Sequence, residues 1–156
     1  STTILDTRKT TPGLRVLEKW AVSLGGGGNH RMGLYDMIML KDNHIDFAGG
    51  IIPAVTSVRE YLSDKQKSLK IEVETRDLQE VREALIAGVD RIMLDNFTTD
   101  DTRIAVALID RRAETESSGG ITKDSLVSYA ECGVDYISVG ALTHQIKSLD
   151  MSLKAL

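Results

Sequence analysis

The chain is poor in the features that mark several large classes of protein. It has one cysteine, Cys132, in 156 residues, so no disulfide can form within it. It has only two Phe, four Tyr and one Trp, and its net charge is −4, which leaves little for base stacking or for neutralising phosphates along a nucleic acid. The longest clear apolar run, 104–109, is far shorter than the roughly 20 residues that a membrane helix needs. Neither nucleic acid nor a membrane is an expected partner.

The composition is otherwise that of a folded globular domain. Hydrophobic residues make up 42% of the chain and charged residues 27%, close to globular averages. The length suits one domain, 1–156, but is too short for a complete barrel of eight βα units. The N-terminus lacks a basic stretch followed by an apolar one, so we expect no secretory signal and take the cytoplasm as the default compartment.

Short apolar or β-branched runs alternate with helical patterns along the chain. The runs begin near residues 3, 37, 70, 91, 113 and 136. Helix signals stand between them: Thr11 and Pro12 before a segment ending at Gly25, Asp77 before a segment ending at Gly88, and further starts at Thr98 and Thr122. In the first segment, we expect Leu14, Leu17, Ala21 and Leu24 to form the buried face. This order predicts a parallel β core wrapped by helices, with a doubly wound open sheet as the competing architecture.

The tripeptide Gly-Val-Asp occurs at 88–90 and again at 133–135, each time between a predicted helix and a predicted strand. The spacing of the two copies suits two βα units.

Polar residues gather where each predicted strand ends, and the carboxyl ends of parallel strands meet at one edge. They are Arg8 and Lys9, the run from Lys41 to His44, Glu74, Asp95 and Asn96, the run from Ser117 to Gly120, and the run from Gly140 to His144. We therefore expect a single site at this edge.

Two features of this set suggest its chemistry. In the run 71–74, the alternation places Glu72 and Glu74 on the face opposite the apolar residues, and Asp95 follows the same pattern. Such interior carboxylates require a cation, a metal or a polar ligand, or they form a structural network with interior Arg or Lys. The cations are concentrated at Arg8, Lys9, His30, Arg31 and Lys41. A solvated surface cluster is the simpler explanation for any one of them, but together they indicate a small anionic substrate.

Glycine-containing loops add a second signal. Gly119-Gly120 and Gly140-Ala141 stand between a strand end and a helix start, where free backbone N–H groups can bind phosphate. The run 25–28 is explained by a turn and a helix end, and Cys132 by packing.

Several segments together carry a family resemblance. They are 6–15 (DTRKTTPGLR), 29–34 (NHRMGL), 41–45 (KDNHI), 72–74 (EVE), 94–96 (LDN), 118–120 (SGG) and 138–144 (SVGALTH). In this order and spacing they resemble quinolinate phosphoribosyltransferase. The resemblance implies transfer of a phosphoribosyl group from phosphoribosyl pyrophosphate to quinolinate with loss of carbon dioxide, giving nicotinate mononucleotide for NAD synthesis. It also implies an incomplete TIM-like α/β barrel of about six parallel strands.

The resemblance also implies roles for single residues, with Mg²⁺ as the cofactor. Substrate binding falls to Thr7, Arg8, Lys9, His30, Arg31, Lys41, Ser118, Gly119, Gly120, Gly140, Ala141, Leu142 and His144. Glu74 and Asp95 match the carboxylates at the ribose and the metal, and Lys9, Lys41, Glu74 and Asp95 form the expected catalytic set. Gly28 and Gln145 are small departures from the family pattern.

The family's enzymes carry an N-terminal α/β sandwich domain, and an arginine from the neighbouring subunit completes the quinolinate pocket. The sequence is therefore expected to be the catalytic barrel without that domain, poorly active alone, from a homodimer or higher homo-oligomer. The alternatives are a related enzyme acting on nicotinate or another heteroaromatic acid, an aldolase-like or thiamin-phosphate-type barrel, and a non-catalytic phosphate-binding fragment.

Overall fold

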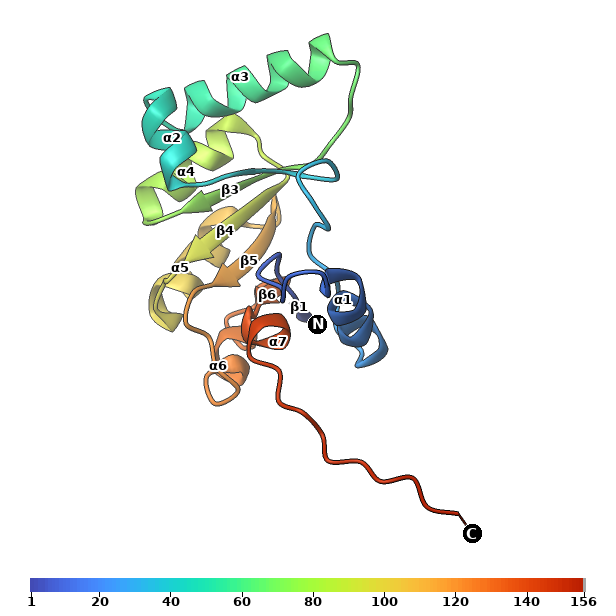
Figure 1. Ribbon diagram of the computed structural model, residues 1–156. Coiled ribbons are helices and arrows are strands. Elements are labelled where there is room, and N and C mark those ends of the chain that lie inside the picture. The colour runs from blue at the N-terminus through green and yellow to red at the C-terminus, as the bar shows by residue number, and fades with distance from the viewer. Residues whose placement is uncertain (156) are drawn as a thin grey trace.

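The protein, seen in a computed structural model that describes residues 1–155, is built on one sheet of six parallel strands (Figure 1). The strands are β1 (Thr3–Leu5), β2 (Ile38–Leu40), β3 (Ile71–Thr75), β4 (Arg91–Asp95), β5 (Glu114–Ser118) and β6 (Tyr136–Ser138). Each begins within one residue of its predicted start.

The strand order identifies the architecture. The sheet runs β1-β6-β5-β4-β3-β2, and every neighbouring pair is parallel. A doubly wound sheet reverses its strand order at a switch point. Here β2 to β6 follow one another in sequence order, and β6 then pairs with β1, as in a ring. The ring is open between β1 and β2, so the incomplete barrel is confirmed. At the open edge Gly28 forms a parallel bridge with Leu5.

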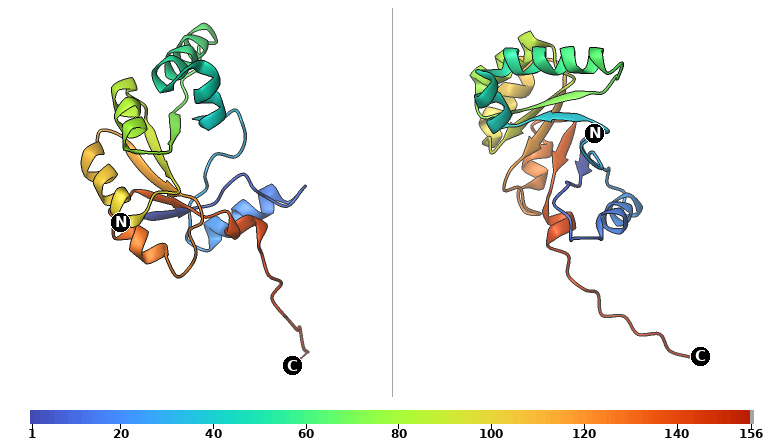
Figure 2. Two further views of the ribbon diagram at one scale, coloured as in Figure 1. Left: turned by 90° about the vertical axis from the view of Figure 1, so that its left-hand side faces the viewer. Right: turned by 45° about the horizontal axis from the view of Figure 1, so that its top comes forward.

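Within residues 1–155, seven helices connect or follow the strands. They are α1 (Arg15–Leu24), α2 (Asp42–Ala48), α3 (Ile51–Asp64), α4 (Leu78–Ala87), α5 (Thr99–Ile109), α6 (Leu126–Ala130) and α7 (Ala141–His144). Figure 2 shows α1 apart from the layer formed by α2 to α5, and the segment after α7 extending away from the body. Across residues 1–155, none of these helices has both the length and the apolar character required to cross a bilayer.

The predicted helix starts at Asp77 and Thr98 are confirmed in α4 and α5. The Asp77 carboxylate accepts the backbone N–H groups of Gln79 and Glu80, and α4 ends at Gly88 with a positive φ of 68°. The Thr98 hydroxyl accepts the N–H of Asp101 at the start of α5. One expectation needs correction, because α6 begins only at Leu126, after a turn that starts at Thr122. The run from Lys41 to His44 follows β2, as expected, and enters helix α2 directly.

The prediction for α1 was wrong in both its start and its buried face. Residues 12–14 form a turn, because Gly13 has a φ of 79° that a helix cannot contain. The helix buries Glu18 and Lys19, while Leu17 and Leu24 are 57% and 73% exposed. This helix therefore turns charged residues inward and apolar residues outward.

The sheet separates an apolar outer layer from a polar interior. The outward side chains of the strands pack against the helices; this core includes Val73, Ile92, Leu94, Ile137, Val55, Val81, Ala84, Ala105 and Ile109. The alternate positions face inward and include Glu72, Glu74, Glu116 and Ser118. The predicted alternation around Glu72 and Glu74 is confirmed.

The repeated Gly-Val-Asp tripeptide has the same task in both places. The Asp90 carboxylate accepts the N–H of Ile71 at 2.7 Å, and the Asp135 carboxylate accepts the N–H of Thr115 at 2.8 Å. Each aspartate, at the start of one strand, therefore fastens the neighbouring strand.

Candidate active site

The carboxyl ends of the six strands form one edge of the barrel, and strand register aligns the polar residues there. Asp95 lies opposite Ser118, Leu5 lies opposite Ser138, and Glu74 lies opposite Met93. The residues that follow the strands are thus carried to the same end of the molecule, as the sequence predicts.

Two interior carboxylates mark this edge. Glu74, at the end of β3, accepts a hydrogen bond from Lys41 Nζ at 2.7 Å, with 47% of the lysine side chain and 12% of the glutamate side chain exposed. Asp95, at the end of β4, accepts the Asn96 amide at 2.8 Å. Magnesium favours one or two carboxylates together with water and substrate oxygens. These two partly buried carboxylates at neighbouring strand ends fit that donor set.

The loops after β1 and β6 meet at the same edge. The Thr143 hydroxyl donates to the carbonyl of Lys9 at 2.7 Å and lies 3.1 Å from that of Gly140. A Cβ atom at Gly140 would lie 2.7 Å from Nε2 of His144 and 3.7 Å from Cδ of Lys9. Lys9, Gly140 and His144 are therefore adjacent, and Ala141 and Leu142 are exposed beside them.

The loop after β5 needs its glycines. Gly119 and Gly120 have φ values of 94° and 60°, in the left-handed region. A Cβ at Gly119 would collide with the side chain of Asn96. The backbone of this loop consequently lies against the loop that follows Asp95.

Arg8 and Arg31 form a pair of like charges at the open side of the barrel. Burial lowers the pKa of Arg31, and the positive charge of Arg8 lowers it further. Arg31 Nη1 donates to the carbonyl of Met37 at 3.2 Å. Arg8 Nε is buried and has no acceptor among residues 1–155. Nearby, the Thr7 hydroxyl accepts the Lys9 N–H at 3.0 Å. Two close guanidinium groups with an unpaired donor suit an anionic ligand.

A buried ion pair holds the segment that carries His30 and Arg31. Asp6 and Lys19 are paired, with side chains 0% and 1% exposed. The Asp6 carboxylate also accepts the His30 N–H at 2.9 Å and the Asn29 amide at 2.6 Å, while Lys19 Nζ donates to the His30 carbonyl at 2.9 Å. The backbone around His30 is thus fixed from both sides.

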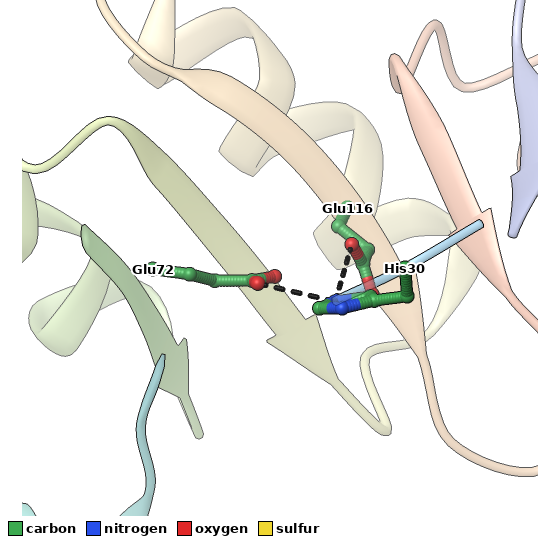
Figure 3. A group of neighbouring side chains, drawn as sticks. All are labelled: His30, Glu72 and Glu116. Carbon is green, nitrogen blue, oxygen red and sulfur yellow. Dashed lines mark ion pairs between the residues drawn. The ribbon is translucent and has the colours of Figure 1, made fainter. Parts of the chain in front are cut away.

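The His30 side chain points into the barrel between two glutamates (Figure 3). Its Nε2 lies 3.1 Å from Glu72 and 3.4 Å from Glu116, and all three side chains are almost completely buried. Arg91 pairs with Glu116 at 3.1 Å. On the other edge of the ring, Nδ1 accepts the backbone N–H of Arg31 at 2.7 Å.

The charges in this cluster shift its proton equilibria. Burial lowers the pKa of His30, but hydrogen bonds to Glu116 and Glu72 and their charges outweigh it and raise the pKa to about 9. Burial raises the pKa of Glu72. Burial also acts to raise the pKa of Glu116, but the hydrogen bond and charge of His30 and the charge of Arg91 lower it overall. A proton on His30 therefore balances the two carboxylates together with Arg91.

His30, Glu72 and Glu116 are also the one group of at least three metal-type donors within 4.8 Å of one another in the part of the chain described. A metal bound there would need the lone pair of Nε2. Nε2 carries a proton in the charged ring and, because Nδ1 accepts the Arg31 N–H, in the neutral ring as well. The distances from Nε2 to Glu72 and Glu116 therefore favour a buried network of ion pairs, which is the structural reading left open for Glu72, with His30 as its partner.

The linings of two cavities include neither Glu74 nor Asp95. One of about 330 Å³ is lined by Asn29, His30, Arg31, Met32, Asp36, Met37 and Arg91. A larger one, of about 1060 Å³, lies against the opposite ends of the strands and includes Ser1, Thr115, Gly133 and Asp135 in its lining. Because parallel barrels perform their chemistry at the carboxyl ends of the strands, we place the site at the edge with Glu74 and Asp95.

Sequence reasoning missed several residues that shape this site. They are Asp6, Arg15, Lys19, Arg91 and Glu116. The alternation of Glu114, Thr115 and Glu116 resembles that of residues 72–74 and could have placed Glu116 inside the barrel. The pairing of Asp6 with Lys19 has no comparable local signal in the sequence. Cys132 is buried at the end of α6, with Sγ near the carbonyls of Thr99 and Ser128, as expected for packing.

Comparison with known proteins identifies the family. The profile described as quinolinate phosphoribosyl transferase, C-terminal domain, matches residues 1–154. The chain is 53% identical to a chloroplastic nicotinate-nucleotide pyrophosphorylase (carboxylating) of Arabidopsis thaliana, covering 97% of this chain and 48% of that protein. A probable enzyme of the same name from Bacillus subtilis is 51% identical over 96% of this chain and 51% of its own length.

A solved structure agrees. The nicotinate-nucleotide pyrophosphorylase of Francisella tularensis superimposes with a TM-score of 0.91 at 47% identity, covering 97% of this chain and 52% of that one. The chain thus spans about half the length of the relatives it matches. With a profile match across nearly all its residues and identities around one half, it belongs to the family of quinolinate phosphoribosyltransferase C-terminal domains.

Proposed function

We propose that this chain is the catalytic barrel of an enzyme that transfers a phosphoribosyl group from phosphoribosyl pyrophosphate to quinolinate, with loss of carbon dioxide. The observation that carries the proposal is the Arg8–Arg31 pair, with its unpaired Arg8 Nε, in a barrel whose edge also carries Glu74 and Asp95. Relatives named for this activity support it.

The cations would bind the dianionic acid. A guanidinium can hold a carboxylate through two parallel hydrogen bonds, so Arg8 and Arg31 would each engage one carboxylate of quinolinate. Lys9, in the loop after β1, and Lys41, at the start of α2, would supply point charges. A lysine ammonium beside the carboxylate that leaves would stabilise the negative charge remaining on the ring, and Lys9 and Lys41 are our candidates for this task.

The carboxylates and glycine loops would handle the sugar phosphate. Breaking the bond to pyrophosphate builds positive charge on the ribose, which Glu74 and Asp95 would stabilise while they bind the hydroxyl groups. Bound Mg²⁺ would neutralise the leaving pyrophosphate, with Glu74 and Asp95 holding it. The loops at Ser118, Gly119 and Gly120 and at Gly140, Ala141 and Leu142 offer backbone N–H groups for the phosphate, with His144 beside them.

The proposal extends to assembly and location. About half of each relative's length has no counterpart in this chain. We propose that this part supplies an N-terminal domain and that a homodimer or higher homo-oligomer completes the quinolinate pocket. We further propose a cytoplasmic location, although the names of plant relatives place those proteins in chloroplasts or mitochondria.

Release of carbon dioxide tests the reaction directly. We expect the whole protein that carries this chain to release carbon dioxide from carboxyl-labelled quinolinate only when phosphoribosyl pyrophosphate and Mg²⁺ are present. Formation of nicotinate mononucleotide from nicotinate, with no release from quinolinate, would show instead that the substrate is the monoacid. Trapping of Lys9 or Lys41 by borohydride in the presence of an aldehyde or ketone substrate would indicate an aldolase-like barrel.

A further inference from the structure

Arg15, the first residue of α1, bridges two segments that lie far from each other in the chain. Its Nε donates to the Thr10 hydroxyl at 3.1 Å, Nη2 donates to the Arg8 carbonyl at 3.2 Å, and Nη1 donates to the Met32 carbonyl at 3.2 Å. Arg8 and Thr10 belong to the loop after β1, whereas Met32 follows Arg31 directly. The Arg15 guanidinium therefore joins the loop that carries Arg8 to the segment that carries Arg31.

The two cations need such a restraint. Arg8 is close enough for its positive charge to lower the pKa of Arg31, so the repulsion between the two guanidinium groups acts to separate the two segments before an anion binds. Arg31 donates to the Met37 carbonyl through Nη1, but Arg8 Nε has no acceptor in the described part of the chain. The backbone contacts made by Arg15 oppose the separation without using the charged groups of either cation.

We infer that Arg15 is a positioning residue that sets the spacing between Arg8 and Arg31, and thereby favours an acid with two adjacent carboxylates over one with a single carboxylate. This inference rests on the proposed function, because it concerns recognition of the same substrate. A fixed spacing favours a ligand that engages both guanidinium groups at once, since no binding energy is then spent on ordering them. A monoacid engages one group and gains little from the spacing.

Lysine cannot replace this side chain. The three acceptors lie in different directions, and the planar guanidinium reaches all of them with separate N–H groups. A single ammonium on a flexible stem would keep the charge but lose the simultaneous contact with both segments. Arg15→Lys therefore separates positioning from charge, and Arg15→Met removes both.

Steady-state kinetics on the whole protein that carries the chain provide the test. We expect Arg15→Lys and Arg15→Met to raise the KM for quinolinate about tenfold or more, the effect of losing one good polar contact. The KM for phosphoribosyl pyrophosphate should change less than about twofold, and inhibition by nicotinate should also be little affected. Arg112→Met is the matched control, because Arg112 also donates to backbone carbonyls, those of Ile109 and Leu108, at the opposite end of the barrel.

Each result has a definite meaning. Equal losses for both substrates, or an Arg15→Lys variant with the parent's KM for quinolinate, would overturn the positioning role. Loss of nicotinate inhibition in parallel with quinolinate affinity would overturn the preference for two carboxylates. Circular dichroism and thermal unfolding check that the variants fold, and Arg15→Lys provides the readout if Arg15→Met does not. A parent protein that does not turn over quinolinate would refute the proposed function itself and this inference with it.

Discussion

Replacing Lys19 by Met should destabilise the protein far more than removing an exposed cation. The Lys19 side chain is 1% exposed and its partner Asp6 is 0% exposed. Methionine preserves most of the aliphatic stem but removes the ammonium, leaving a carboxylate buried without its counterion. Loss of one partner from a buried ion pair costs about 3–5 kcal/mol.

The surroundings of Asp6 place the expected loss at the lower end of that range. The carboxylate keeps two donors, the His30 N–H at 2.9 Å and the Asn29 amide at 2.6 Å. Lys19→Met also leaves the His30 carbonyl without its donor. A loss of about 3 kcal/mol corresponds to a fall in Tm of about 6–12 °C for a chain of this size. Because the pair holds the backbone of His30, the KM for quinolinate should rise as well.

Urea denaturation followed by circular dichroism measures this free energy. Arg103→Met is the control, since Arg103 pairs with Asp100 on the surface of α5 with half of its side chain exposed, and such pairs contribute about 0.5 kcal/mol or less. The double variant Asp6→Asn/Lys19→Met should recover part of the loss, because the uncompensated charge is gone. Equal destabilisation by Lys19→Met and Arg103→Met would refute the reasoning.

Four further outcomes follow from the site. Arg31→Ala should weaken quinolinate binding much more than phosphoribosyl pyrophosphate binding in titration calorimetry, and equal losses would contradict its assignment. Asp95→Asn should lower Mg²⁺-dependent turnover by about two orders of magnitude or more with the fold retained, whereas full activity at saturating Mg²⁺ would remove it from the site. Gly119→Ala should lower both Tm and turnover, since its φ is 94° and a Cβ would strike Asn96; an unchanged Tm would show that the loop accommodates the methyl group. Because the pKa of His30 is raised from 6.5 to about 9, the charged imidazole should stabilise the folded protein by up to about 3 kcal/mol relative to His30→Gln below pH 6.5, and this stabilisation should be lost as the pH rises to 9. A difference in unfolding free energy that does not change with pH would mean that the Arg31 N–H keeps the second proton off Nδ1.

The strands and the shared edge were predictable because their signals are local. A buried parallel strand needs several apolar or β-branched residues in a row, and the polar residue that ends it is visible in the sequence. The helix start at Asp77 is equally local, because its carboxylate bonds with residues only two and three positions ahead. The curved arrangement of the sheet depends on the pairing of β6 with β1, which lies more than 130 residues earlier in the chain. No residue near either strand predicts that pairing.

The failure at α1 has a specific physical cause. The usual reading of an amphipathic helix assumes that the interior is apolar, so that Leu17 and Leu24 should face it. In this molecule the helix faces the polar loops at the open side of the barrel, where the buried partners are the Asp6 carboxylate for Lys19 and the Thr11 N–H for Glu18. Burial of a charged group is tolerated only when a group of opposite charge or a hydrogen-bond partner lies beside it. Which face of a helix is buried therefore depends on the surface against which the helix packs. A helix that positions an anion-binding site can be buried through its charged face.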